Sequence, residues 1–253
     1  MQSQMFDIGL NNEKNRRNWL AARLAALPKG IRILDAGAGE LVNRPLCAHL
    51  DYVSQDFCQY DGKGDGAGMQ VGRWDTSKID IVCDVVAIPE PDASFEAILC
   101  SEVLEHVPDP LLAVKEFSRL LKPGGILILT APFCSLTHFA PYHFSTGFSS
   151  YWYDHHLKAN GFEILEMVPN GNWFHFLAQE LWRLPKMAGT YSWRPGGWLA
   201  LVFAVPVLLM LAILAGRRDR GSSELLAYGW HVLARRRAAS SGATRVDASH
   251  QSN

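Results

Sequence analysis

Three aspartates in the first third of the sequence each follow a short apolar run that is typical of a strand, and they are Asp35, Asp56 and Asp84. The first leads into Gly37-Ala-Gly39, where glycines let the backbone turn tightly and let a ligand come close, and we expect a helix with free amides to follow. Asp56, about twenty residues after the glycines, can accept hydrogen bonds from both ribose hydroxyls. Asp84, at the next strand end, can accept a hydrogen bond from an adenine amino group. Taken singly, each aspartate also suits a turn or a helix cap. Together they predict a nucleoside site.

Histidines that can carry a proton occur in an aromatic stretch, residues 133–153, which follows a predicted strand. Ligands of open α/β sheets bind at such strand ends, and an imidazole there can take a proton from a hydroxyl group. We therefore predict His138 or His143 as the base, with a hydrogen-bonded loop histidine as the alternative. We expect His106 to pack near the ligand. No Asp/His cluster has metal-ligand spacing, so the sequence predicts no metal site.

The aromatic residues of this stretch have two interpretations. They suit stacking on a sugar or an apolar acceptor, and they suit the core of a lid slightly better.

The elements that must position these residues alternate between strands and helices. We predict strands at 31–35, 52–53, 79–84, 95–100, 126–130 and 162–168, with helices at 11–27, at 104–121 and before Asn160. A stretch with five glycines, 61–72, stands where a crossover helix is usual, either as a tolerated insertion or as a functional lid. The pattern predicts an α/β fold.

Four motifs carry a resemblance to a known family. In order, they are Ile33-Leu-Asp-Ala-Gly-Ala-Gly39, Asp84 with Ile88-Pro-Glu-Pro-Asp-Ala-Ser-Phe95, Ser101-Glu-Val-Leu-Glu-His-Val107 and Leu121-Lys-Pro-Gly-Gly125. Over residues 15–168 the sequence resembles class I S-adenosylmethionine-dependent methyltransferases, and within them the methyltransferase type 11 subgroup. The resemblance implies a Rossmann-like, doubly wound, mostly parallel seven-stranded sheet.

The resemblance also implies roles for particular residues. Asp35, Gly37 and Gly39 would line the methionine part of S-adenosyl-L-methionine. Asp56 would bind its ribose, Asp84 and Val85 its adenine, and Ser101 would lie at the sheet edge under the sulfonium. Glu40-Leu41 stands where the family has a further glycine.

Composition sets limits on partners and location. The 253 residues suit one α/β domain with an appendage, and 24 Lys+Arg against 25 Asp+Glu give a net charge of -1, which does not favour nucleic acid. No C-x-x-C pair occurs among the cysteines, which suggests a reducing compartment. The first residues lack the features of an export signal, so we expect a cytoplasmic protein. The cysteines are Cys47, Cys58, Cys83, Cys100 and Cys134.

An uncharged block, residues 197–216, is the strongest feature of the C-terminal third. At about 1.5 Å per residue it can reach across the roughly 30 Å of a hydrocarbon core. A last sheet strand at 225–233, however, would put both flanks on the cytoplasmic side. We therefore expect a re-entrant hairpin broken near Pro206, or a helix in the membrane interface. A buried or dimer-forming helix is the alternative, and a single span is possible if 225–233 is not a strand.

These observations divide the chain and suggest its function. We predict a cofactor-binding core at 1–168, an aromatic and apolar membrane-associating insertion at 169–222, a last strand within 223–237 and a disordered tail at 238–253. The predicted activity is O-methylation of a small molecule, a glycan or a lipid-linked saccharide at the inner face of the cell membrane. One alternative is an isoprenoid quinone or lipid methyltransferase. Another is a membrane scaffold that binds the cofactor without turnover.

Overall fold

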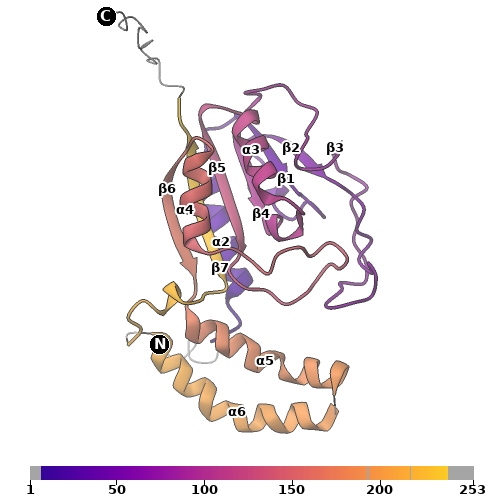
Figure 1. Cartoon of the computed structure of the whole chain (residues 1–253), viewed down its shortest axis with the longest axis vertical. Helices are drawn as coiled ribbons and strands as arrows, with labels where there is room; N and C mark the ends of the chain where they lie inside the picture. The colour runs from indigo at the N-terminus through magenta and orange to yellow at the C-terminus, as the bar shows by residue number, and fades with distance from the viewer. Residues whose placement is uncertain (1–6, 193, 217, 239–253) are drawn as a thin grey trace, which may run out of the picture.

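The computed structural model describes residues 7–192, 194–216 and 218–238 and contains a seven-stranded sheet (Figure 1). The strands lie in the order β3-β2-β1-β4-β5-β7-β6, and β7 is antiparallel to both of its neighbours while the pairs from β3 to β5 are parallel. The predicted Rossmann-like, mostly parallel sheet is confirmed. Its strands are β1 (Arg32–Ala36), β2 (Asp51–Asp56), β3 (Ile81–Val82), β4 (Phe95–Ser101), β5 (Leu121–Pro132), β6 (Phe162–Asn170) and β7 (Gly229–Arg236).

Helices cover both faces of this sheet. Alternate residues of a strand point to opposite faces, and in β4 Ala97 and Leu99 pack with α2 whereas Ile98 and Cys100 pack with α3 and α4. The α-helices are α2 (Asn12–Ala25), α3 (Pro110–Leu120), α4 (Ser150–Ala159), α5 (Trp173–Tyr191) and α6 (Arg194–Ala215), and short 3-10 helices are η1 (Arg44–Cys47), η2 (Leu104–His106) and η3 (Ser222–Glu224).

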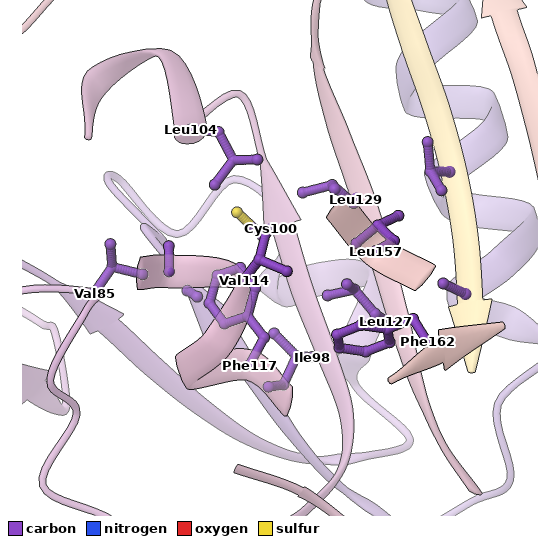
Figure 2. Close-up of a cluster of buried hydrophobic side chains, with 14 of the residues drawn as sticks. Val85, Ile98, Cys100, Leu104, Val114, Phe117, Leu127, Leu129, Leu157 and Phe162 are labelled. Atoms are coloured by element: carbon purple, nitrogen blue, oxygen red, sulfur yellow. The ribbon is translucent and has the colours of Figure 1, made fainter. Parts of the chain in front are cut away.

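The larger core lies between the sheet and the α3/α4 layer (Figure 2). Phe117 of α3 and Leu157 of α4 reach the strand residues Ile98 and Leu127, and all four side chains are fully buried. Burying side chains of this size stabilises the fold by about 1.5–3 kcal/mol each, before the entropy of ordering them is subtracted. This packing fixes the strand ends that carry the site.

The helix predicted at 104–121 is divided in the structure. Residues 104–106 form only the 3-10 turn η2, and α3 begins at Pro110. A residue before proline avoids the helical backbone, and Asp109 instead caps α3 by accepting the amides of Leu111 and Leu112. As a result, His106 lies on a turn at the sheet edge.

The helix expected after the glycine turn is also absent from the structure. Residues that follow Gly39 form a turn and then η1, because Leu41 has a left-handed backbone (φ 61°) that a right-handed helix cannot contain. The segment is therefore a loop that leads into η1, in place of the expected helix.

The last strand of the sheet, β7, lies between two earlier strands. The predicted last strand is present as β7, which inserts between β5 and β6 and begins at Gly229 rather than at Leu225. Of the predicted tail, only Ala238 falls among the described residues.

The apolar block belongs to α6, which forms a helical hairpin with α5 (Figure 1). The expected break at Pro206 is wrong: α6 continues through this residue, which is exposed, while Leu208 and Leu211 pack with Ala178 of α5. Asn172 ties the two ends together, because its amide donates to the Ala215 carbonyl at 3.1 Å. Among the described residues, no helix has both the length and the apolarity to cross a membrane.

Candidate active site

A cavity of about 430 Å³ opens at the carboxyl ends of β1, β2, β3 and β4. Open parallel sheets hold their ligands at this edge. One side of the cavity is formed by residues at or just after strand ends, including Gly37, Asp56 and Asp84, which we call the strand-end side. The opposite side comes from segments 57–74 and 139–144, which we call the loop side.

The glycines on the strand-end side lie so close to neighbouring side chains that no Cβ atom fits there. Gly37 has a positive φ of 74°, and a Cβ atom there would lie 2.4 Å from Val103 Cγ2. At Gly39 (φ 51°) a Cβ atom would lie 2.5 Å from the Trp74 ring. Both positions therefore need glycine, for backbone conformation and for space.

Two carboxylates flank these glycines. Asp56 is buried on the cavity wall, and its two oxygens accept the amides of Gly39 and Cys58 at 3.0 and 2.8 Å. Each oxygen keeps a free lone pair for a ligand hydroxyl. Asp84 is exposed at the cavity, and its Oδ1 accepts the Val86 amide at 3.2 Å. The pair provides acceptors at two successive strand ends.

Four of the seven predicted cofactor residues line the cavity: Gly37, Asp56, Asp84 and Val85. Asp35, Gly39 and Ser101 are outside its wall, and Ser101 Oγ pairs with Thr130 Oγ1 at 2.8 Å. The roles predicted for these residues stay predictions.

Asp35 is 1% exposed and accepts a hydrogen bond from the Tyr52 hydroxyl at 2.7 Å. Burial raises the pKa of this carboxyl to about 7, against the lowering effect of the hydroxyl.

Aromatic rings dominate the loop side. Tyr60 stacks on Phe139 with ring centroids 4.5 Å apart, and Trp74 meets the same ring at 5.1 Å. Tyr142 contacts Phe57 edge to face at 4.9 Å. The aromatic stretch 133–153 included Phe139 and Tyr142, but sequence reasoning missed the other three, which flank the glycine-rich loop 61–72.

The glycine-rich loop 61–72 packs against the histidine-bearing segment. The Met69 amide donates to the Thr137 carbonyl at 2.9 Å, and the Phe139 amide donates to the Met69 carbonyl at 3.2 Å. A Cβ atom at Gly64 would lie only 1.8 Å from the Ala140 carbonyl oxygen. Glycine thus permits a close approach of two backbones. A lid role for the loop stays a prediction.

Three histidines meet beside this wall. Ring centroids are 4.7 Å apart for His106 and His138, and 4.9 Å apart for His138 and His143. His106 lines the cavity and stacks on Phe139 at 5.2 Å, whereas the two predicted bases lie outside the cavity wall. The three histidines are too far apart in the sequence to form a recognisable metal-ligand motif, so the sequence did not indicate this group.

A buried carboxyl faces the histidines. Glu105 is 1% exposed, and its Oε1 lies 3.8 Å from His106 Nε2 and 4.0 Å from His138 Nε2. Burial, and then the nearby charge of Glu102, raise the pKa of Glu105 well above its usual range. Burial and the neighbouring His138 lower the pKa of His106 to about 4, so this imidazole is neutral at pH 7.

A family model described as a methyltransferase domain matches residues 11–181, which is more than half of the chain. The chain belongs to this methyltransferase family. The predicted resemblance is thereby confirmed, and the cofactor of this class is the predicted one, S-adenosylmethionine.

Curated relatives resemble part of the chain. A ubiquinone biosynthesis O-methyltransferase of Xanthomonas campestris pv. campestris is 47% identical over 122 residues, which are 46% of this chain and 48% of that protein. The protein of the same description from Xylella fastidiosa is 35% identical over 122 residues, 46% of each chain. The chain thus spans about half the length of the curated relatives it matches.

Solved structures share the fold at low sequence identity. Phosphoethanolamine N-methyltransferase 2 of Haemonchus contortus in complex with S-adenosyl-L-methionine has a TM-score of 0.50 and 16% identity, over 88% of this chain and 52% of that chain. The [4+2]-cyclase SpnF has a TM-score of 0.52 and 19% identity, over 89% of this chain and 81% of that chain. One of these two is named a cyclase, so the shared fold alone does not identify the reaction.

Proposed function

We propose that the chain transfers a methyl group from S-adenosylmethionine to a hydroxyl group on the ring of a quinone-type lipid. The observation that carries this proposal is the cavity itself, where carboxylates at strand ends face a wall of aromatic rings. The similarity to ubiquinone biosynthesis O-methyltransferases supports it and favours the quinone alternative over a glycan acceptor.

The residues on the strand-end side would hold the cofactor. We assign the ribose hydroxyls to Asp56 and the adenine amino group to Asp84, and we assign the methionine part to the turn at Gly37, where no side chain blocks the backbone. When bound, S-adenosylmethionine supplies a methyl group that its sulfonium already activates. The chain then has to orient the acceptor and remove its proton.

The loop side would hold the acceptor ring. Tyr60, Trp74 and Phe139 present ring faces and edges, and offset or edge-to-face contacts between aromatic rings contribute about 0.5–1.5 kcal/mol beyond the area they bury. A flat quinol ring matches such a wall.

Proton removal would take place at the histidine group. The predicted bases His138 and His143 remain a proposal, and the structure adds His106 as the member that lines the cavity. His106 Nδ1 lies 2.5 Å from the Tyr142 carbonyl oxygen, which can only accept, so Nδ1 carries the hydrogen and Nε2 keeps its lone pair. That nitrogen can take a proton.

We further propose that the α5–α6 hairpin lies in the interface layer of the membrane, on its inner face. It begins three residues after β6, at the same sheet edge as the cavity, and α6 exposes apolar side chains there. Exposed apolar patches of this kind mark interaction sites, and an interfacial helix needs no span. The exposed residues are Val202, Val205, Val207, Met210 and Ile213.

A methyl-transfer assay tests the proposal. Purified protein is incubated with methyl-labelled S-adenosylmethionine and, separately, with a hydroxylated short-chain quinol, a lipid-linked saccharide and a soluble glycan, and products are identified by mass spectrometry. We expect one methyl ether on the quinol ring. A methylated sugar would instead support the glycan function, and cofactor binding without any product would support the scaffold alternative. Either outcome contradicts the proposed acceptor.

A further inference from the structure

Lone pairs converge within the histidine group. The Nδ1 atoms of His106 and His138 lie 2.5 and 2.8 Å from the carbonyl oxygens of Tyr142 and Leu136. A carbonyl oxygen only accepts, so each neutral ring carries its hydrogen on Nδ1 and presents a lone pair at Nε2. Both Nε2 atoms lie on the side of Glu105 Oε1, at 3.8 and 4.0 Å.

Among the described residues, no hydrogen-bond donor satisfies the Nε2 lone pairs of His106 and His138. The separations of 3.8 and 4.0 Å from Glu105 Oε1 are too long for hydrogen bonds, and Glu105 Oε2 is buried without a partner. Both ring nitrogens of His143 are likewise buried without a partner. Buried polar atoms without partners cost about 1–3 kcal/mol each, so a positive ion at the centre of the group would stabilise the fold.

The geometry suits a metal ion. Ligand nitrogens from His106, His138 and His143 all lie within 4.8 Å of one another. Metal–nitrogen bonds of about 2.0–2.1 Å place tetrahedral ligands roughly 3.4 Å apart, so the rings need to close by about 1.4 Å at most. The backbone carbonyls at Nδ1 are also the partners that orient histidine ligands in metal sites.

We propose that His106, His138 and His143 bind one divalent transition-metal ion, beside the buried carboxyl group of Glu105. Imidazoles suit zinc and the neighbouring metals, whereas magnesium and calcium prefer oxygen ligands. Three protein ligands leave a fourth coordination position free for water. The ion would fasten η2 to the loop that carries Phe139 and Tyr142, and so hold the loop side of the cavity in place.

The site has a consequence for the reaction. An imidazole whose lone pair binds a metal cannot take a proton, so ligation excludes His106, His138 and His143 alike as bases. Proton removal at this group, as proposed above, therefore requires that the ion be absent. The metal site itself does not rest on the proposed function, because its occupancy is measured without cofactor or acceptor.

Metal titration of untagged full-length protein tests the proposal. After treatment with a chelator, the protein is titrated with Zn²⁺ and with Co²⁺, whose absorption spectrum reports tetrahedral coordination, and thermal melts are recorded. We expect one ion per chain, a higher Tm with metal, and no competition from excess Mg²⁺. His143→Ala and His138→Ala should each weaken binding at least about 100-fold. His155→Ala is the matched control, because His155 is an exposed histidine on α4.

Three results would overturn the site. These are wild-type protein that binds neither ion, a folded His143→Ala variant that binds as the wild type does, and displacement of Zn²⁺ by Mg²⁺. Circular dichroism separates loss of ligation from loss of folding, and two different ligand variants guard against a single misfolded one.

Discussion

The two sides of the cavity differ in how the chain builds them. The strand-end side uses short turns after β1, β2 and β3, and most of its key residues lie within a few positions of a strand. The loop side joins segments 57–74 and 139–144, which meet only through contacts such as Tyr60 on Phe139. Parallel strands bring their carboxyl ends together by topology, whereas loops meet only where backbones and side chains permit it.

This difference leads to separate expectations for stability and for acceptor binding. Changes on the strand-end side should alter folding and cofactor affinity. Changes on the loop side should alter acceptor use while cofactor binding persists. The α5–α6 hairpin belongs to neither side and should respond to membranes alone.

The largest expected effect is the pH dependence of stability from Asp35. Its pKa is about 7 in the folded chain and 3.8 ordinarily, so the folded state holds the extra proton between these values. The contribution is complete below about pH 4 and is lost as pH rises through about 7, a change of at most about 4 kcal/mol.

Urea unfolding at pH 5 and pH 8 measures this dependence. Wild-type protein should lose more unfolding free energy between the two pH values than Asp35→Asn, whose side chain can still accept from the Tyr52 hydroxyl. Equal losses in both proteins would show that Asp35 titrates normally.

Gly64 provides a sharper test of the loop side. In Gly64→Ala the new Cβ atom would lie 1.8 Å from the Ala140 carbonyl oxygen, so the two loops must separate. Gly66→Ala is the matched control, because Gly66 also has a positive φ (81°) but has open space around it.

We expect Gly64→Ala to lower kcat/KM for the acceptor by about tenfold or more relative to Gly66→Ala, while affinity for S-adenosylmethionine changes little. A tenfold loss corresponds to about 1.4 kcal/mol of transition-state stabilisation. If the two variants behave alike, contact between the loops does not shape the acceptor wall.

The smallest effect on folding is expected in the hairpin. Met210 is 52% exposed, so Met210→Lys should change the free energy of unfolding by less than about 0.5 kcal/mol. The same change should weaken binding to anionic lipid vesicles by roughly tenfold or more, because an apolar contact with the membrane interior is lost.

Vesicle sedimentation separates this effect from a change in net charge. Val42→Lys is the control, since Val42 is 63% exposed and lies in the turn after β1, outside the hairpin. Unchanged sedimentation of Met210→Lys, or equal losses in both variants, would remove the hairpin from the membrane model.

The sequence indicated more of the residues that line the strand-end side than of those that line the loop side, for a physical reason. Motif residues such as Asp56 and Asp84 lie at strand ends, and strand order fixes where those ends meet. His106 and His138 come together only because a loop folds back on the sheet edge. The helix and strand periodicity of a sequence does not predict how a loop folds. The same limit applies to α3, where the helical pattern starts at Leu104 but proline delays the helix to Pro110.

The most direct test of the central assignment is calorimetric titration of purified protein with S-adenosylmethionine. We expect wild-type protein to bind it, and Asp56→Ala and Asp84→Ala to weaken binding by roughly 10- to 150-fold, the equivalent of losing about 1.5–3 kcal/mol from a hydrogen bond to a charged group. Asp51→Ala is the matched control, because Asp51 is exposed at the opposite end of β2, and it should bind as the wild type does. Folded wild-type protein that releases no heat and shows no binding would contradict the account.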